Sequence, residues 1–427
     1  MYNIITAGLL FNAASIPCSI FMRLCEVYGA EELAKGETVK TAVYSGYKKA
    51  FVAVLDGNIT TAIVAAVLMI AGTGTMISFG FTLLIGVLVN CFIGVPVSRK
   101  VMNSLLAFNG LNKESFFKPK KEKKEIKLFE NKKIFFIVSA VFFVAGIVAI
   151  AVNGLQLDTQ FKGGTVLEYS LSENSIDDSA VKSAVDAVVN RNSTIQLSTS
   201  AANDTTTLVV TMAGNDGLTP SELTEVNDAV AETIGADELE PSTTYVVEPY
   251  IGAKALRNAI IAIVVSFALI LLYIGIRFAA LSGLSAGLTA ILALLHDVCI
   301  VIFAFAAFGI PVGNSFVAVV LTIIGYSIND TIVVYDRIRE NNNSNKSLSY
   351  PELIDKSVTQ VLGRSINTSI TTIACVIIIL VASVVYRISS IYEFALPMTF
   401  GLVSGCYSSL GVAAILWGIW KTRGSKK

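Results

Sequence analysis

The chain has 427 residues, of which 54% are hydrophobic and only 15% are charged. A charged fraction well below the usual quarter excludes an ordinary soluble domain and indicates a membrane protein. The formal net charge is zero, which excludes the strongly basic balance of a nucleic-acid-binding protein, so no nucleic-acid partner is expected.

Nine stretches are apolar over about the 20 residues needed to cross roughly 30 Å of hydrocarbon. They lie near residues 3–22, 51–71, 76–97, 134–153, 258–276, 283–309, 313–334, 365–385 and 394–420. The first stretch lacks the basic start of a secretory signal and carries Arg23 after its apolar residues, so we interpret it as a membrane helix. We predict a polytopic α-helical membrane protein with about nine spans.

Charge is segregated along the chain. Residues 99–133 contain 11 Lys or Arg and 4 Asp or Glu. Residues 155–250 contain only 3 Lys or Arg but 16 Asp or Glu. Because cytoplasmic loops favour Lys and Arg, the basic segment and the tail 421–427 are predicted to lie inside the cell. The acidic stretch then lies outside, and loops 22–50 and 335–364 lie inside. The outer acidic surplus fits solubility, and a docking surface for an exported partner is the alternative.

The outer stretch has the pattern of a small α+β domain. Two helices are predicted: one opens at Ser175 with Asp178 three residues on, and one opens at Thr219 with Pro220 and Glu222 in a capping box. Four strands are predicted from alternating, β-branched sequences at 165–171, 194–200, 206–213 and 243–249. The order β-α-β-β-α-β is that of a ferredoxin-like domain.

Several chemistries find no support in the sequence. FKGGT (161–165) is predicted to be a tight turn into a strand rather than a phosphate loop, because its lysine precedes the glycines and no helix follows. The chain has six cysteines, all in or beside spans, and one histidine. We therefore expect no external disulfide framework, no metal and no cofactor, and no enzyme activity.

Short similarities indicate an internal repeat, in which the first three spans are a degenerate copy of the last three. Such membrane repeats place their site where the halves meet. The paired segments are FMRLCE (21–26) with YDRIRE (335–340), DGNITTAI (56–63) with NTSITTIA (367–374), and FGFTLLIG (79–86) with FALPMTFG (394–401).

Asp330 interrupts the apolar run 313–334, and the next span returns with Arg364 at a comparable depth. The two are expected to pair, since an isolated charge at bilayer depth costs about 2.5 to 3.5 kcal/mol. Polar residues of the returning helix recur at i, i+3, i+4, i+7 and i+8, so this stripe is expected to face Asp330. The residues predicted to line the polar path are Ser327, Asn329, Asn367, Thr368, Thr371 and Thr372.

The pair Asp330 and Arg364 suggests a proton relay, because protonation of the carboxylate would free the arginine and let the helices repack. A static salt bridge that locks two helices is the alternative. His296 and Asp297 stand in the middle of span 283–309, where they could hand on protons or pack helices. In the first half of the chain, Asp56 stands at the start of the segment that corresponds to the polar stripe. It is either a second proton site or an ordinary aspartate near the inner membrane interface.

These residues carry a family resemblance. GYSINDTIVVYDRIREN (325–341), followed by LGRSINTSITT (362–372), resembles the signature pair of the SecF family. Further matches are LDTQFKGGT (157–165), VEPYIGAKALRNAI (247–260) and LLHDV (294–298). Residues 9–105 resemble the last three spans of SecD, so the chain resembles the rear part of a fused SecD–SecF.

The resemblance implies a division of the chain into six parts. These are SecD-like spans (1–105), a basic cytoplasmic linker (106–133), a first SecF-like span (134–153), an extracytoplasmic ferredoxin-like domain (154–256), five SecF-like spans (257–420) and a basic cytoplasmic tail (421–427).

It also implies the resistance-nodulation-division superfamily and a proton-driven accessory role late in preprotein export at the outer face of the bacterial cytoplasmic membrane. Asp330 and Arg364 match the family's proton-site pair, whereas Ser15 stands where the SecD half has an aspartate. The implied partners are SecD (as a separate chain or a preceding part of this one), the SecYEG channel, YajC, YidC and unfolded preproteins. A proton-coupled exporter of lipids or drugs and a non-transducing membrane scaffold are the alternatives.

Overall fold

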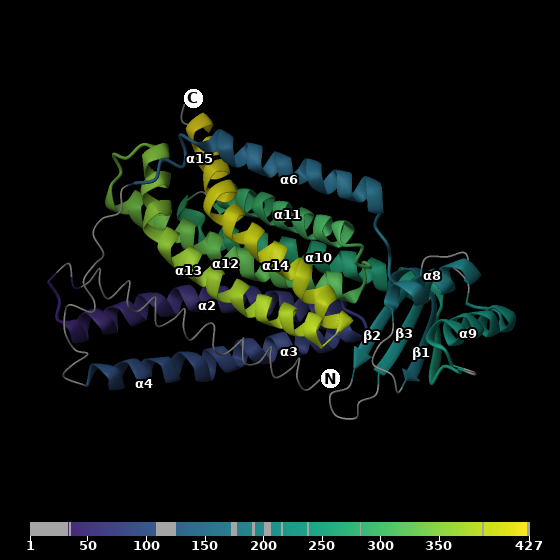
Figure 1. Cartoon of the computed structure of the whole chain (residues 1–427). Coiled ribbons are helices and arrows are strands. Elements are labelled where there is room, and N and C mark those ends of the chain that lie inside the picture. The colour runs from purple at the N-terminus through teal and green to yellow at the C-terminus, as the bar shows by residue number, and fades with distance from the viewer. Residues whose placement is uncertain are drawn as a thin grey trace.

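The structure, a computed structural model, describes a helical bundle and a small sheet domain (Figure 1). The described residues are 33, 36–107, 125–171, 177–189, 193–199, 206–214, 217–236, 239–281, 283–386 and 388–424. The predicted span 3–22, with Ser15, lies outside these ranges.

Eight helical stretches of the described residues are long and apolar enough to cross a membrane. They are formed by α2 (Val39–Ala71); α3 (Thr75–Val89), η1 (Asn90–Gly94) and α4 (Val95–Leu106); α6 (Lys132–Asn153); α10 (Pro249–Arg277); α11 (Gly283–Ala307); α12 (Asn314–Ser344); α13 (Tyr350–Val385); and α14 (Ser389–Tyr407), η3 (Ser408–Ala413) and α15 (Ala414–Gly424). A short 3₁₀ helix, η2 (Ala279–Leu281), joins α10 to α11. The predicted polytopic helical fold is confirmed.

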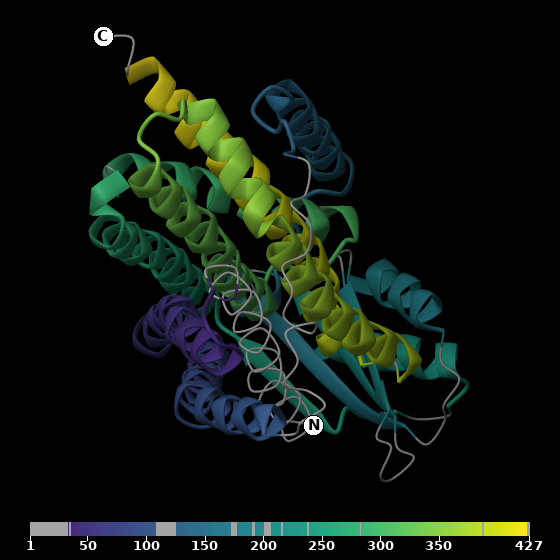
Figure 2. The same ribbon diagram turned by 90° about the vertical axis from the view of Figure 1, so that its left-hand side faces the viewer.

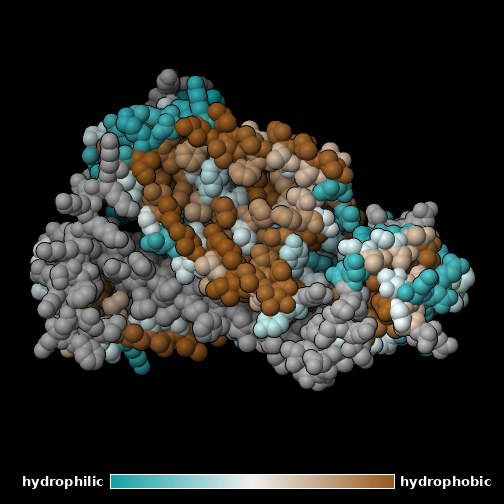
Figure 3. All heavy atoms as spheres, in the orientation of Figure 1, coloured by the Kyte–Doolittle hydropathy of each residue, from teal (hydrophilic) through white to brown (hydrophobic). Residues whose placement is uncertain are grey.

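The helices run side by side between two ends (Figures 1 and 2). We call the end beside the sheet domain the domain end, and the end where α12 turns into α13 the far end. On the face of the bundle shown in Figure 3, apolar side chains predominate between more polar ends. This distribution is the one expected of a protein whose middle faces hydrocarbon.

Helix α12 is the centre of the bundle, because most of its apolar stretch is buried against its neighbours. It packs against α2 of the first half and against α11, α13 and α14 of the second. Helix α6 is the least buried of these helices. Most of its residues are exposed, and Gly146 is its buried residue. Polar groups on α12 are therefore shielded from lipid by protein on several sides.

Several helices extend beyond the predicted spans. Helix α13 begins at Tyr350, 15 residues before the predicted span, because Ser349 and Glu352 form a capping box there. Helix α10 begins at Pro249, where proline is favoured in the first helical turn. Hydropathy locates only the apolar part of a helix, so these polar extensions lay outside the predicted spans.

A π-helical segment interrupts the helix in each half of the bundle. In the first half it is η1, which begins at the buried Asn90, and in the second half it is η3, which begins at the buried Ser408. Each π turn widens the helix next to polar side chains, a feature frequent at functional sites.

The sheet domain has four antiparallel strands in the order β2-β3-β1-β4. Its elements are α7 (Thr159–Lys162), β1 (Gly164–Leu171), α8 (Asp178–Val189), β2 (Ser193–Thr199), β3 (Thr206–Ala213), α9 (Pro220–Ile234) and β4 (Thr243–Val247). This is the predicted ferredoxin-like arrangement.

Alternating side chains of the sheet make the core of this domain. Leu167 of β1 lies opposite Val210 of β3, and both pack under the two helices. Burial of each such aliphatic side chain stabilises the fold by roughly 1.5 to 3 kcal/mol. Helix α9 starts with the predicted capping box of Thr219 and Glu222.

Helix α8 begins at Asp178, and Ser175, where its opening was predicted, lies outside the described residues. The carboxylate of Asp177 accepts hydrogen bonds from the N–H groups of Ser179 and Ala180, so Asp177 satisfies the donors of the first turn.

The turn into β1 depends on two glycines. Gly163 and Gly164 have φ angles of 89° and 135°, in the region that glycine adopts without steric penalty. A Cβ atom on Gly164 would lie 2.1 Å from the carbonyl oxygen of Met212. The predicted tight turn is present, preceded by the short helix α7 that was not predicted.

Candidate functional site

Asp330 is buried on the central helix α12, with 5% of its surface exposed. On the neighbouring helix α13, Ser369 Oγ donates to Asp330 Oδ2 at 3.4 Å. Arg364 of the same helix attracts the carboxylate electrostatically. The structure therefore brings Asp330 and Arg364 together across the α12–α13 contact, where low polarity strengthens the attraction between opposite charges.

The predicted polar stripe of α13 divides between two faces. Thr368 and Thr372 are buried, as is Ser369. Asn367 and Thr371 are exposed. Each of them lies two residues from Ser369, which is about 200° around a helix, so they point away from α12. Asn367 and Thr371 therefore lie off the buried face that contacts α12, whereas Ser369, which was not among the predicted residues, lies on it.

The hydroxyls on the buried face of α13 contact α12. Tyr326 of α12 donates its phenolic hydrogen to Thr372 Oγ1 at 2.9 Å, and Thr372 in turn donates to the Thr368 carbonyl at 3.1 Å. This polar seam extends from Asp330 toward the domain end, since Tyr326 precedes it by about one helical turn.

Asn329 faces the first half of the bundle. A Cβ atom on Gly57 of α2 would lie 2.6 Å from Asn329 Oδ1, so glycine allows the two helices to approach. Asn329 Oδ1 is buried and has no hydrogen-bond partner among the described residues. Asn329, predicted to line the polar path, therefore lies at the α2–α12 contact.

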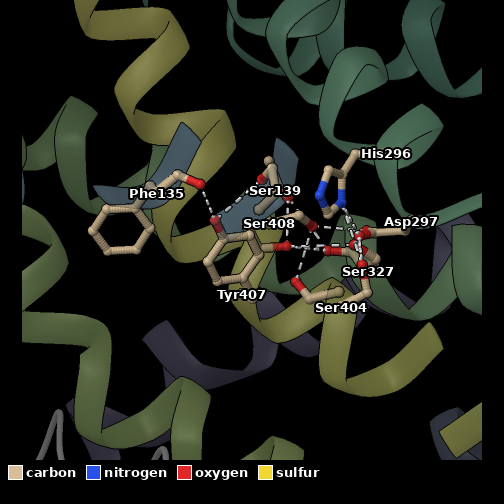
Figure 4. A network of polar contacts seen from close by, with 11 residues as sticks. Phe135, Ser139, His296, Asp297, Ser327, Ser404, Tyr407 and Ser408 are labelled. Carbon is tan, nitrogen blue, oxygen red and sulfur yellow. Dashed lines mark hydrogen bonds and ion pairs between the residues drawn. The ribbon is translucent and has the colours of Figure 1, made fainter. Parts of the chain in front are cut away.

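Asp297 of α11 is completely buried in a cage of serine hydroxyls (Figure 4). Ser327 of α12 and Ser408 of η3 donate to its Oδ2 atom, each at 2.7 Å. Ser404 of α14 donates to its Oδ1 atom at 2.6 Å. The partners come from helices far apart in the sequence, so this cage could not be predicted from local spacing.

His296 lies beside this cage, with its Nδ1 atom 3.3 Å from Asp297 Oδ1. Its ring packs against Phe143 of α6 and Tyr407 of α14, at centroid distances of 5.4 and 5.9 Å. The structure thus brings together the two adjacent residues, although neighbours on a helix point about 100° apart.

Asp56 does not extend the polar path. Arg277 of α10 binds it with Nη2 3.0 Å from Oδ2, and Tyr273 donates its hydroxyl hydrogen to Oδ1 at 2.7 Å. Asp336 of α12 lies 3.8 Å from the same guanidinium. Asp56 therefore joins the two halves toward the far end, and Arg277 is a partner that the sequence analysis missed.

The domain end of α12 is tied to the sheet domain. Val312 N donates to the Gln156 carbonyl at 2.7 Å, and Asp158 N donates to the Val312 carbonyl at 3.1 Å. A Cβ atom on Gly313 would lie 2.5 Å from Asp158 Oδ2. Burial raises the pKa of Asp158, and hydrogen bonds from Thr159 and from backbone N–H groups oppose this rise.

A second contact joins the sheet domain to α14. Gln196 of β2 donates from Nε2 to Glu393 Oε1 at 2.6 Å. Ser389 Oγ also donates to the Leu197 carbonyl at 3.4 Å. Asp158 repels Glu393 electrostatically. The sheet domain therefore contacts both α12 and α14, the two helices that carry the polar side chains around Asp330 and Asp297.

In the described part of the chain, no three His, Cys, Asp or Glu side chains lie together as metal ligands would.

Comparison with known proteins gives the family. Residues 226–423 match the family described as "Protein export membrane protein SecD/SecF, C-terminal". The protein translocase subunit SecF of Alicyclobacillus acidocaldarius is 35% identical over 300 residues, which cover 69% of this chain and 92% of that protein. The chain belongs to the SecF/SecDF family.

Longer members of the SecF/SecDF family match almost the whole chain. The protein translocase subunit SecDF of Bacillus subtilis is 31% identical over 419 residues, covering 93% of this chain and 54% of the relative. The crystal structure of SecDF from Thermus thermophilus, described as a translocon-associated membrane protein, has a TM-score of 0.78 at 27% identity and covers 98% of this chain and 55% of that one. The chain spans about half the length of these SecDF relatives.

Proposed function

We propose that this multi-pass protein is a proton-driven accessory subunit of the Sec translocon, which promotes a late stage of preprotein export. In this proposal it lies in the bacterial cytoplasmic membrane with its acidic sheet domain outside. Asp330 binds and releases the proton, and Arg364 is the counter-charge that is freed when the carboxylate is neutral. Export itself is the activity that the names of the SecF and SecDF relatives suggest.

The position of Asp330 carries the proposal. The carboxylate is 5% exposed within an apolar span, where an ion costs about 2.5 to 3.5 kcal/mol even on the mildest scales. Loss of its charge would break its attraction to Arg364. A proton crossing 100 mV supplies about 2.3 kcal/mol, comparable with the interaction to be broken.

The hydrogen bonds at the domain end would connect a movement of α12 to the sheet domain. Asp330 lies on α12, whose first residues are hydrogen-bonded to the segment that leads into the sheet domain. Helix α14 contacts the same domain through Glu393. A repacking of α12 against α13 would therefore move elements that hold the sheet domain, which is the part proposed to act on the emerging preprotein.

The partners follow from the same proposal. SecD, as a separate chain or as a preceding part of this one, would supply the remaining length of the SecDF relatives. SecYEG would be the channel, and YajC, YidC and unfolded preproteins the further contacts. The polar path would be lined by Ser327, Thr368, Ser369 and Thr372, which are the buried hydroxyls near Asp330.

The variant Asp330→Asn tests the proposal, because asparagine keeps the size and polarity but cannot carry the proton. In cells that lack their own SecD and SecF, we expect export driven by this chain and a SecD partner to fall by up to about 50-fold. That figure is the equivalent of about 2.3 kcal/mol per proton at 100 mV. Imposing or collapsing the proton gradient should then have no effect on the variant.

Asp336→Asn is the matched control, since Asp336 lies on the same helix with 34% of its side chain exposed. This control should keep gradient-dependent export. A non-transducing scaffold predicts the reverse pattern: Asp330→Asn would lower the thermal stability of the protein, while export remaining per folded molecule would still respond to the gradient.

A further inference from the structure

Asp297 is a second buried acid, and its hydrogen-bond partners are suited to a carboxylate. Three serine hydroxyls lie 2.6 to 2.7 Å from its two oxygens. All three can donate at once to a carboxylate, which has acceptor lone pairs on both oxygens. The cage is therefore suited to an ionised Asp297.

An ionised carboxylate favours one tautomer of His296. Its Nδ1 atom lies 3.3 Å from Asp297 Oδ1 and 3.3 Å from Ser404 Oγ; because a carboxylate only accepts, it favours a hydrogen on Nδ1. Nε2 then holds a lone pair. This atom is buried and has no hydrogen-bond partner among the described residues, and the side chain as a whole is 10% exposed.

Asp297 has one ion-pair partner in the described part of the chain, and that partner is His296. The other titratable side chains near the pair are Cys299 on the same helix and Cys406 and Tyr407 on α14. Helix α6 contributes an aromatic ring, Phe143. An imidazolium would therefore be the balancing charge of Asp297.

The pair is connected to the α12 face that carries Asp330. Ser327 donates to Asp297 and precedes Asp330 by three residues, about 4.5 Å along the helix. Helix α12 runs from the domain end to the far end, so Asp297 lies nearer to the sheet domain than Asp330 does.

We propose that Nε2 of His296 is a second proton-binding site of the chain, with Asp297 as its counter-ion. The step adds one proton from water to the Nε2 lone pair, and the resulting imidazolium donates from Nδ1 to Asp297 while the serine cage stays intact. If the proposed function holds, a proton that enters from the sheet-domain side reaches His296 before it reaches Asp330.

The sequence offers a direct probe, because the chain has a single histidine. The full chain would be labelled with ¹³C,¹⁵N-histidine, purified without a histidine tag and placed in lipid nanodiscs. The ring ¹⁵N shifts would then be followed by NMR from about pH 9 to about pH 5, the range in which imidazole titrates. We expect a neutral ring with hydrogen on Nδ1 that becomes doubly protonated as the pH falls.

Two variants test the role of the counter-ion. Asp297→Asn removes the balancing charge, so the doubly protonated fraction at a given pH should fall. Ser404→Ala keeps the carboxylate but removes the hydroxyl that contacts both Asp297 Oδ1 and His296 Nδ1, so the doubly protonated fraction at a given pH should change. Ser266→Ala is the matched control, because the Ser266 hydroxyl is buried on α10 without a hydrogen-bond partner in the described residues.

A ring that stays neutral down to about pH 5 would overturn the proposal, and so would Asp297→Asn and Ser404→Ala spectra that match the unmodified chain at every pH. Asp330→Asn separates this inference from the proposed function. The imidazole should still titrate in that variant, so a failure of proton-driven export and a failure of proton binding at His296 give different results.

Discussion

The ring of Phe303 on α11 lies against the backbone of α6 at Gly146, where a Cβ atom would stand 2.0 Å from Phe303 Cγ. Phe143 of α6 packs edge-on against the same ring, at a centroid distance of 5.3 Å. This close contact holds the middle of α6 against α11, beside His296, while Ser139 and Asn153 tie the helix to Tyr407 and Ala306.

Gly146→Ala should detach or displace α6, because a methyl group cannot share space with ring carbons. We expect a loss of about 1 to 3 kcal/mol, the usual result of overpacking, measured as a lower thermal midpoint in detergent. Gly275→Ala is the control, since nothing lies within 4 Å of that Cβ position. Phe303→Ala in the Gly146→Ala chain should restore α6 packing, and no recovery in that double variant would contradict the account.

Arg277→Gln should destabilise the bundle more than Asp56→Asn. Without Arg277, the buried Asp56 keeps only the hydroxyl of Tyr273, and removing one partner of a buried pair costs about 3 to 5 kcal/mol. Without Asp56, the arginine retains Asp336 at 3.8 Å, so the loss should be smaller. Unfolding of the two single variants and the double variant gives the coupling energy. Equal losses, with no coupling, would show that the pair does not join the halves.

Asp158 should make the stability of the sheet domain fall as the pH rises. Burial raises its pKa in the folded protein, whereas the unfolded chain has the ordinary value of about 3.9. The folded state therefore binds the proton more tightly, so stability is greatest below about pH 3.9 and decreases until the pH passes the folded pKa. Asp158→Asn should remove this decrease, as measured by thermal unfolding across the acidic range.

Asp186 provides a control with the opposite sign. Burial would raise its pKa, but hydrogen bonds from Ser193 and Lys182 outweigh this effect and hold the pKa below its usual range. The stability that Asp186 contributes is fully present above about pH 3.9. It is lost as the pH falls through the pKa of Asp186 in the folded protein. Asp186→Asn should therefore lower stability at neutral pH, where Asp158→Asn raises it. The same sign for both variants would contradict the assignment.

Gln196→Ala should loosen the contact between β2 and α14. The variant removes the donor to Glu393 and leaves that carboxylate facing the repulsion of Asp158. A hydrogen bond to a charged group contributes about 1.5 to 3 kcal/mol, so amide exchange over residues 193–199 should speed up by about tenfold or more.

Thr194→Ala, on the same face of β2, is the control for this exchange measurement. It leaves the donor to Glu393 in place and should keep the original rate. If both variants exchange alike, the contact with α14 does not restrain the strand.

Features coded by short sequence patterns could be predicted. The apolar spans follow from hydropathy, and the start of α9 follows from Thr219 and Glu222 because a cap is a contact over three residues. On α13, the predicted polar stripe and the buried polar face differ by one residue position. Spacings of three and four residues mark an arc of the helix, but they do not say which edge of that arc faces inward. The structure centres it on Ser369.

The remaining contacts join residues far apart in the chain. Asp297 meets Ser404 and Ser408 only after α14 has returned beside α11. Arg277 meets Asp56 only after the two halves have packed. Such pairings depend on the angles and offsets between helices, which local periodicity does not encode.

The π turns fix the rotational phase of the last helix. A π turn holds one residue more than an α turn, so every side chain after Ala413 is offset by about 100° from its place in an uninterrupted α-helix. Ser408, at the start of the segment, donates to Asp297, and with this offset Trp417 lies 1% exposed in the core. Deleting one residue from 408–413 would let the segment close as ordinary α turns and shorten the helix by about 1.5 Å, so the indole of Trp417 would still face the core. The extra residue therefore serves the wide turn in which Ser408 and Ser409 meet Asp297 and Ser327, and not the thickness of the bilayer.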